Sequence, residues 1–334
     1  MTQRARILLT STPEMRANYY GARALDALAR AGDVVLHEGA EPLAGDALIE
    51  AARGCRIIVT DRNTPMPAMV LAHIPDAVAV LRVAVDVRNI DVAAASAAGI
   101  LVCQASRTWV PAVSELVIGL MLDAARGISR ANIAYKAGRA PAVGQGVQLA
   151  GATVGIIGYG PLARRVAELA LAFGMHVVVH DPYVRVDRAD IAEAGLAELL
   201  READFVLPLA VATAETENLI GRAELAQMKS TAFLINLSRG NLVDEAALIE
   251  ALDARRIAGA ALDVGRAPDQ MPSPELARRA DVSATPHIGG LTPDAIEGQA
   301  LETAAQAAVI LAGQIPSGAL NAEHATRLRP AITR

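Results

Sequence analysis

Three short stretches in the second half of the sequence place reactive side chains directly after apolar runs. Arg239 follows "LINLS", Asp263 ends "GAALD", and His287 lies in "TPHIGG" (285–290). Because the carboxyl ends of parallel strands form the edge of a sheet where ligands bind, we expect these side chains to lie close together. Histidine titrates near neutral pH and can exchange a proton, whereas the arginine fork can hold a planar carboxylate in two bonds.

Each of these residues also has an ordinary structural explanation. Arg239 could belong to an exposed loop, Asp263 could cap a turn, and His287 could be a hydrogen-bonded core histidine. The two glycines that follow His287 and Ile288 favour a catalytic histidine at the mouth of a cleft, since a buried structural histidine does not need them. We predict no metal site, and only structural roles for the other histidines: His37, His73, His176, His180 and His324.

A glycine-rich turn opens the second half of the chain. The stretch "TVGIIGYGPLARRVAELALAFGMHVVVHDP" (153–182) contains G-x-G-x-x-A between an apolar run and a helical pattern. Gly158 permits the tight turn, Gly160 lets a pyrophosphate approach the backbone, and Ala163 lets the helix pack on the strand. Since Pro161 has no N–H, the backbone donors at the helix start must come from Leu162 and Ala163.

The next apolar run, "HVVVH", ends in Asp181. A carboxylate there accepts the ribose hydroxyls of NAD and repels the 2′-phosphate of NADP, so we favour NAD, although Arg185 lies four residues on. Two alternatives remain: a glycine turn that serves packing alone, and a methyltransferase, whose second strand can also end in an acid that holds a ribose. The six strand candidates of this half and the stretches downstream count against the methyltransferase.

The composition limits the possible partners and compartments. The net charge is −5 without a basic stripe, so we expect no nucleic-acid partner. No apolar run reaches the ~18 residues of a membrane span, and the first residues do not form a signal peptide. Cys55 and Cys103 lie in apolar runs, which favours buried free thiols and a cytoplasmic location.

The order of apolar runs predicts an α/β protein with two Rossmann-like domains. Each run is apolar throughout, as expected for parallel strands covered on both faces, and helical patterns separate the runs. The helix predicted at 111–128 is apolar on nearly every side and should be buried between domains or against another subunit. The strand candidates are 6–10, 33–37, 56–60, 81–85 and 99–103 in the first half, and 153–158, 176–181, 204–210, 232–238, 258–264 and 281–286 in the second.

The stretches "GIIGYG", "NLSRGNLVDE", "GAALDV" and "TPHIGG" occur in that order, and from about residue 80 to 321 the chain resembles the D-isomer-specific 2-hydroxyacid dehydrogenase family. The resemblance implies an NAD-dependent oxidoreductase that interconverts a small 2-oxo acid and its D-2-hydroxy acid, acting as a homodimer. It also implies a flavodoxin-like substrate domain at 1–102 and 291–334, and an NAD-binding doubly wound parallel sheet at 103–290.

The resemblance assigns roles to individual residues. His287 would be the general acid and base, Arg239 would hold the carboxylate and carbonyl oxygen of the substrate, and Asp263 would accept a hydrogen bond from the nicotinamide amide. The rest of the predicted cofactor contacts are Gly158, Gly160, Leu162, Ala163, Asp181, Ser238 and Gly290.

The chain departs from the family pattern beside the histidine. The family pairs this histidine with a glutamate, but the position aligned without gaps is Pro268, and a one-residue insertion places Asp269 there instead. Asp269 is therefore the predicted partner of His287, one methylene shorter than glutamate. If it fails in that role, the histidine lacks its orienting carboxylate.

The predicted substrate loops depart further. In "AVDVRNID" (84–91), Ala84 and Asp86 replace glycines whose backbone N–H groups would reach the substrate carboxylate; Asp86 either contacts substrate or turns outward to pair with Arg88. The predicted substrate contacts are Arg62, Val85, Asp86, Trp109 and Arg239.

These changes leave the substrate and even the activity open. The stretch "LAVA" (209–212) lacks the histidine and proline that the family places near the adenine. Asp86 and Trp109 suggest a substrate with a different anion geometry or an added positive group. The alternative is an NAD(H)-binding regulatory or interaction protein with weakened catalysis.

Overall fold

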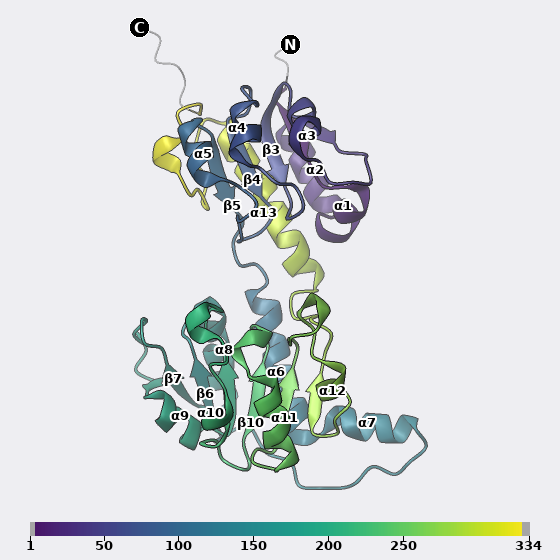
Figure 1. Ribbon diagram of the computed structural model, residues 1–334, viewed down its shortest axis with the longest axis vertical. Helices are drawn as coiled ribbons and strands as arrows, with labels where there is room; N and C mark the ends of the chain where they lie inside the picture. Colours follow the sequence, from purple (N-terminus) through teal and green to yellow (C-terminus); the bar gives the residue numbers. More distant parts are fainter. Residues whose placement is uncertain (1–3, 329–334) are drawn as a thin grey trace. The chain divides into compact units, whose positions relative to one another are not determined.

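The computed structural model of the chain describes residues 4–328, which divide into two compact units (Figure 1). Unit 1 contains the described residues up to Trp109 and from Thr292 onward, and unit 2 spans Val110–Leu291. The chain first passes from unit 1 to unit 2 at Trp109–Val110, later than the predicted boundary near residue 102. The reason is that Ser106 and Thr108 stay bound to the helix of the chain's last segment, with Ser106 N donating to Glu302 Oε2 at 2.7 Å.

The sheet of unit 1 has five parallel strands, in the order β2-β1-β3-β4-β5 that is typical of flavodoxin-like folds. Successive side chains alternate between its faces: Ile7 and Leu9 enter one core, and Leu8 enters the other. The strands are β1 (Arg6–Leu9), β2 (Asp33–Leu36), β3 (Cys55–Thr60), β4 (Ala79–Arg82) and β5 (Leu101–Gln104).

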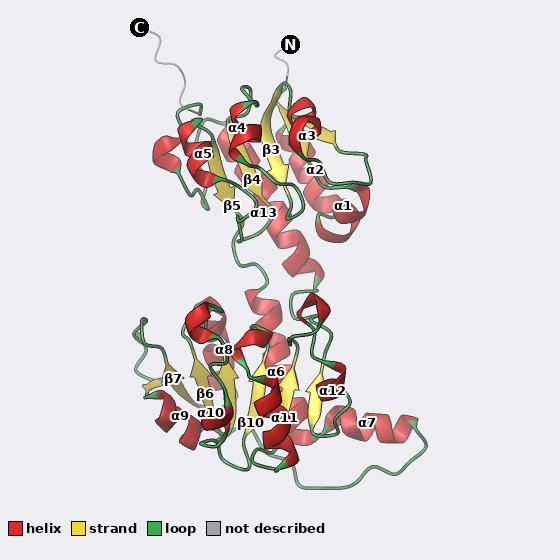
Figure 2. Ribbon diagram, viewed as in Figure 1, coloured by secondary structure: helices red, strands yellow, loops and turns green. Residues whose placement is uncertain are grey.

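Helices cover both faces of this sheet, which is why its central strands are largely apolar (Figure 2). One face is covered by α2 (Ala22–Ala31) together with α13 (Pro293–Leu311), which returns from the end of the chain and packs against α2. The remaining helices of unit 1 are α1 (Pro13–Tyr19), α3 (Gly45–Ala51), α4 (Ala68–Ala72), α5 (Val92–Ala97) and the 3₁₀ turn η4 (Ala322–His324).

The sheet of unit 2 is parallel and doubly wound, in the order β12-β11-β10-β9-β6-β7-β8. The order reverses between β6 and β9, and the carboxyl edge at such a reversal is where dinucleotides bind. The strands are β6 (Thr153–Ile157), β7 (His176–His180), β8 (Ala192–Glu193), β9 (Phe205–Pro208), β10 (Phe233–Asn236), β11 (Gly259–Leu262) and β12 (Val282–Ala284).

The apolar helix of unit 2 is α6 (Val110–Arg126), which ends at Gly127 in the left-handed conformation, with φ 63°. It packs against α8 (Pro161–Ala172) and the sheet, so much of its apolar surface is covered within unit 2 itself. The other helices are α7 (Ile128–Lys136), α9 (Leu196–Glu202), α10 (Arg222–Leu225), α11 (Glu245–Asp253), α12 (Pro274–Ala277), η1 (Ala214–Thr216), η2 (Gly240–Leu242) and η3 (Pro268–Gln270).

The predicted fold class, an α/β protein with two parallel, doubly wound sheets, is confirmed. Across residues 4–328, no helix has both the length and the apolar character that crossing a bilayer requires.

Candidate active site

The glycine turn after β6 has the geometry that a phosphate cradle needs. Gly158 has φ 94°, and a Cβ there would lie 2.7 Å from the backbone of Ala210, so only glycine fits. A Cβ on Gly160 would instead meet no heavy atom within 4 Å. Helix α8 begins directly afterwards with no side chain capping it, which leaves its first N–H groups facing this open space. The turn therefore fits a pyrophosphate.

Asp181, at the end of β7, is held by the backbone around it. Its carboxylate accepts the N–H groups of Tyr159 at 2.7 Å, Tyr183 at 2.8 Å and Val184 at 2.9 Å. Partial burial raises the pKa of Asp181, but the three backbone donors outweigh it and hold the pKa below its ordinary value. The group is therefore ionised, and with about four acceptor positions it can take one further hydroxyl donor.

The arginines near Asp181 are already paired with carboxylates. Arg164 donates to Asp187 at 2.8 Å, and its guanidinium also lies over the ring of Tyr159, 4.2 Å from the centroid. Arg185 donates to Glu193 at 3.0 Å. Since these cations are neutralised locally, the arrangement favours a free ribose hydroxyl over a 2′-phosphate.

The turn that carries Arg239 is fixed by a buried amide. Asn236, the last residue of β10, is 1% exposed; its Nδ2 donates to the carbonyl of Arg239 at 2.9 Å, and its Oδ1 accepts the N–H of Ser238 at 3.1 Å. A Cβ on the next residue, Gly240, would collide with the carbonyl of Gly265, so this turn and the one after β11 pack closely. Arg239 is exposed, with Nη1 donating to the carbonyl of Ser238 at 2.8 Å.

Asp263, just beyond β11, is 1% exposed and binds the segment that contains the histidine. Its Oδ1 accepts the hydroxyl of Thr285 at 2.6 Å and the N–H of Ile288 at 2.8 Å, and its Oδ2 accepts the N–H of Gly289 at 2.9 Å. The carboxylate predicted to meet the nicotinamide thus already holds residues on both sides of His287.

His287 has the left-handed φ of 54° that is uncommon for a residue with a side chain. Its Nδ1 lies 2.8 Å from the backbone carbonyl of Asp269. A carbonyl can only accept, so Nδ1 carries the hydrogen and Nε2 is the nitrogen left to exchange a proton. The sequence predicted a contact through the Asp269 carboxylate, but that group is exposed and, within residues 4–328, makes no hydrogen bond or ion pair.

The predicted substrate residues of unit 1 lie on its exposed loops. Asp86 is paired with Arg88, which donates from its backbone N–H at 3.0 Å and from Nε at 2.8 Å, and these hydrogen bonds lower the pKa of Asp86. Arg62 is exposed, with its guanidinium 5.8 Å from the ring centroid of Tyr19. Val85 and Trp109 are half-buried.

Sequence reasoning missed Arg82, the last residue of β4. It is 6% exposed, and its hydrogen bond among the described residues runs from Nε to Asn89 Oδ1 at 3.1 Å. Burial lowers the pKa of Arg82, an effect that the charges of Asp61 and Asp86 partly offset. Arg82 is thus a buried cation at the carboxyl end of a parallel strand, and the signal in the sequence was an arginine closing an otherwise apolar run.

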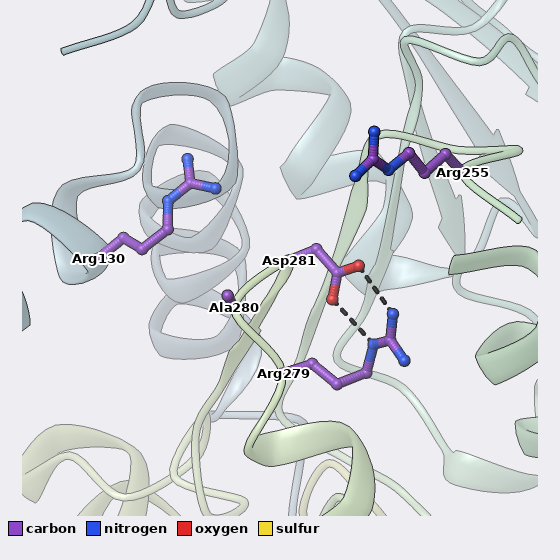
Figure 3. Close-up of a pocket in the computed structure, with 5 residues that line it drawn as sticks. All are labelled: Arg130, Arg255, Arg279, Ala280 and Asp281. Atoms are coloured by element: carbon purple, nitrogen blue, oxygen red, sulfur yellow. Dashed lines mark hydrogen bonds and ion pairs between the residues drawn. The ribbon is translucent and has the colours of Figure 1, made fainter. Parts of the chain in front are cut away.

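A cavity of about 390 Å³ lies elsewhere in unit 2, near the amino ends of β11 and β12 (Figure 3). Its walls contain Arg279, which donates to Asp281 at 2.8 Å and to Asp253 at 2.6 Å. The turns of Arg239 and His287 follow the carboxyl ends of the strands, so this cavity is not part of the candidate active site. Its lining residues are Arg130, Arg255, Arg279, Ala280 and Asp281.

Comparison with known proteins places these features in a family. Residues 118–289, just over half of the chain, match the model described as D-isomer specific 2-hydroxyacid dehydrogenase, NAD binding domain. The chain belongs to this family. The matched segment includes the glycine turn, Asp181, Arg239 and His287, and NAD is the cofactor of this domain.

Individual relatives agree with this assignment. The chain is 34% identical over 303 residues to D-3-phosphoglycerate dehydrogenase of Methanocaldococcus jannaschii, covering 89% of this chain and 57% of that protein. It is 33% identical over 260 residues to hydroxypyruvate reductase of Thermotoga maritima, covering 76% of this chain and 84% of that protein. The chain spans about half the length of the first phosphoglycerate dehydrogenases that it matches.

Solved structures share the fold. A protein from Thermus thermophilus is 30% identical, with a TM-score of 0.76 over 94% of this chain and 99% of that one. D-2-hydroxyisocaproate dehydrogenase is 21% identical, with a TM-score of 0.82 over 95% of this chain and 99% of that one, and it supports the fold alone.

Proposed function

We propose that the chain is an NAD-dependent oxidoreductase that interconverts a small 2-oxo acid and its D-2-hydroxy acid. The observation that carries the proposal is His287, held on the carboxyl edge of the unit 2 sheet with Nδ1 bonded to a carbonyl and Nε2 left free. NAD supplies the hydride chemistry when bound. Everything else in the reaction falls to the side chains and backbone of this chain.

In this proposal, His287 and Arg239 divide the work on the substrate. In reduction, His287 with a hydrogen on both ring nitrogens gives the proton of Nε2 to the carbonyl oxygen as negative charge develops there. In the reverse direction, the neutral imidazole takes that proton on Nε2 and keeps the hydrogen on Nδ1. Arg239 uses one nitrogen to bond Ser238, which fixes the guanidinium and leaves its other donors for the substrate carboxylate and carbonyl oxygen.

The cofactor contacts that we propose follow the open turn and the strand ends. Gly158 and Gly160 shape the cradle, the N–H groups of Leu162 and Ala163 bind the pyrophosphate, and Asp181 accepts a ribose hydroxyl. Ser238 directly precedes Arg239, and Gly290 is the third residue after His287. Both are proposed to flank the nicotinamide. Asp263, predicted to accept a hydrogen bond from the nicotinamide amide, already accepts three hydrogen bonds from the segment that contains His287.

Unit 1 is proposed to be the substrate-binding domain, with Arg82 and Arg62 as receptors for an anionic group. Because Arg88 neutralises Asp86, an added positive group on the substrate is not needed to satisfy that carboxylate. Val85 and Trp109 are proposed to shape the pocket. Because Ala84 and Asp86 stand where the family has glycines, we expect this chain to prefer a different substrate from its relatives.

A homodimer is also proposed, and α7 supports it. This helix exposes Ile128 by 55%, Ile133 by 61% and Tyr135 by 72%. Apolar side chains of this size gathered on one surface helix are typical of a subunit contact. The buried free thiols of Cys55 and Cys103 support the further proposal of a cytoplasmic location.

The direct test is NADH oxidation with a panel of small 2-oxo acids, including glyoxylate and hydroxypyruvate. The wild type should turn over at least one acid, and His287→Ala should lower kcat by about 10²–10⁴-fold with little change in NADH affinity. The rival, a regulatory NAD(H)-binding protein, draws support from the exposed carboxylate of Asp269, which leaves His287 without its expected acidic partner. Tight NADH binding without turnover of any acid would favour that rival.

A further inference from the structure

The segment around His287 is attached to one buried carboxylate on both of its sides. Thr285, two residues before the histidine, and Ile288 and Gly289, directly after it, all donate to Asp263. The N–H of Thr285 also donates to the carbonyl of Leu262 at 2.9 Å, which anchors the start of the segment on β11. His287 therefore lies between two points that are fixed to the end of the same strand.

This attachment explains how His287 keeps an unfavourable backbone conformation. A left-handed φ in a residue with a side chain persists only where its surroundings impose it. The carboxylate of Asp263 is 1% exposed, and a buried charge that loses a donor is costly, so its three donors hold the segment firmly. A Cβ on Gly289 would lie 3.0 Å from Asp263 Oδ2, so the glycine allows this close approach.

The imidazole itself is oriented from the other side by a main-chain atom. The loop after Asp263 closes on itself, with Gly265 N donating to the Gln270 carbonyl at 2.8 Å, and it presents the Asp269 carbonyl to His287. Unlike a carboxylate, a carbonyl carries no charge and does not titrate. It selects the hydrogen on Nδ1 but brings no anion to the histidine.

We infer that Asp263 and Thr285 are positioning residues for His287, and that the Asp269 backbone replaces the carboxylate that orients the histidine elsewhere in the family. The inference rests on the proposed function. It gives Asp263 a role in holding the histidine that does not depend on the nicotinamide contact implied by the resemblance. It also makes the side chain of Asp269 dispensable, since only its carbonyl is used.

A matched pair of substitutions tests the role of Thr285. Thr285→Val removes the hydroxyl donor at constant size and should lower kcat by about tenfold, while Thr285→Ser keeps the donor and should stay within about twofold. The KM for the acid and the Kd for NADH should change little in either variant. Exposed Thr231, changed to Val, is the control. Wild-type kcat in Thr285→Val, or equal losses in kcat and NADH affinity, would overturn the inference.

Two further variants separate the roles of the aspartates. In Asp263→Asn, the new amide group points a donor at a backbone N–H that the carboxylate accepted, so the segment that contains His287 should shift. A displacement of His287 by about 1 Å should lower kcat by roughly 10²-fold, while the NADH Kd stays within about threefold. A raised Kd with kcat retained would instead assign Asp263 to the nicotinamide. Asp269→Asn, which suits the left-handed φ of 57°, should stay within about threefold of wild type. A loss there as large as that of His287→Ala would contradict the inference.

A readout without substrate distinguishes this inference from the proposed function. Nitrogen NMR of the imidazoles, assigned with His287→Gln, should show the hydrogen on Nδ1 in wild type and Asp269→Asn, and a mixture in Asp263→Asn. If no acid is turned over but this pattern holds, the proposed function fails and the positioning stands. In the neutral imidazole of the wild type, a hydrogen on Nε2 instead of Nδ1 would overturn the positioning whatever the activity.

Discussion

Gly160 gives the sharpest prediction at the level of a single residue. Its φ of −78° suits any residue, and a Cβ there would meet nothing, so Gly160→Ala should fold with unchanged stability. The added methyl would occupy the cradle for the pyrophosphate and should raise the NADH Kd by at least about tenfold. Fluorescence titration with NADH measures the Kd, and thermal melting checks the fold. An unchanged Kd would place the cofactor elsewhere.

Arg82 tests the proposed anion site of unit 1. Arg82→Met keeps most of the side-chain volume and removes the charge. Because a charge-assisted hydrogen bond contributes about 1.5–3 kcal/mol, the KM for the acid should rise about 10–100-fold. The NADH Kd should not change, since the proposed cofactor contacts lie in unit 2. Steady-state kinetics at saturating NADH decide this, and a KM equal to that of wild type would remove Arg82 from the site.

Asp181, at the end of β7, should make the free energy of unfolding depend on pH. Its folded-state pKa is below the ordinary value, so its contribution to stability is present above the unfolded pKa of about 3.9 and is lost as the pH falls through the lower folded value. Asp181→Asn should therefore lower the free energy of unfolding by about 1 kcal/mol near neutral pH, with the difference shrinking below about pH 4. Urea unfolding across this range measures it; a constant difference would contradict the assignment.

Sequence patterns predicted the place of the candidate site residues better than the contacts that hold them. Arg239, His287 and Asp181 were predicted to follow strands, and they lie just beyond the carboxyl ends of β10, β12 and β7. The contacts of Asn236 and Thr285 were not predictable, because a buried polar side chain reveals its partners only after folding. The Asp269 contact was missed for a related reason: it is made by a carbonyl, which every residue has.

Among the elements, most strands of both sheets were predictable because coverage on two faces makes them largely apolar. Strand β8 was not, since Ala192–Glu193 is short and exposed at the sheet edge. Helix α6 was recognised from its composition, but the elements that bury it were not predicted. They are α8 and the sheet of its own unit. The sequence alone indicates which face of a helix must be buried. It does not indicate which element buries that face.

Helix α7 tests the proposed homodimer. Ile133 is 61% exposed near the middle of this helix, and Ile133→Glu places a charge there without disturbing a core. We expect a shift from dimer to monomer in sedimentation velocity, with an unchanged circular dichroism spectrum. The exposed Glu168→Gln on α8 serves as the control. If the wild type is monomeric, or the variant dimerises equally well, α7 is not the subunit contact.

At the scale of the whole molecule, two α/β units are built from one chain that crosses between them at Trp109–Val110 and Leu291–Thr292. Each unit has its own cores, so each can place its functional residues on a rigid sheet edge. The two-domain organisation followed from the repeated order of strands and helices. The position of the first boundary was not predictable, because the hydrogen bonds of residues 106 and 108 to α13 do not change the pattern of hydrophobic residues.

We propose that hydride passes between NAD and carbon 2 of a small acid beside His287. Mass spectrometry of the product tests this, when a 2-oxo acid is reduced with NADH that carries deuterium at both positions of its reactive carbon. We predict a D-2-hydroxy acid with one deuterium at carbon 2 from the wild type, and at least about a 10²-fold slower yield from His287→Ala. Oxidation of NADH without deuterium in the acid, or equal yields from the two proteins, would contradict the account.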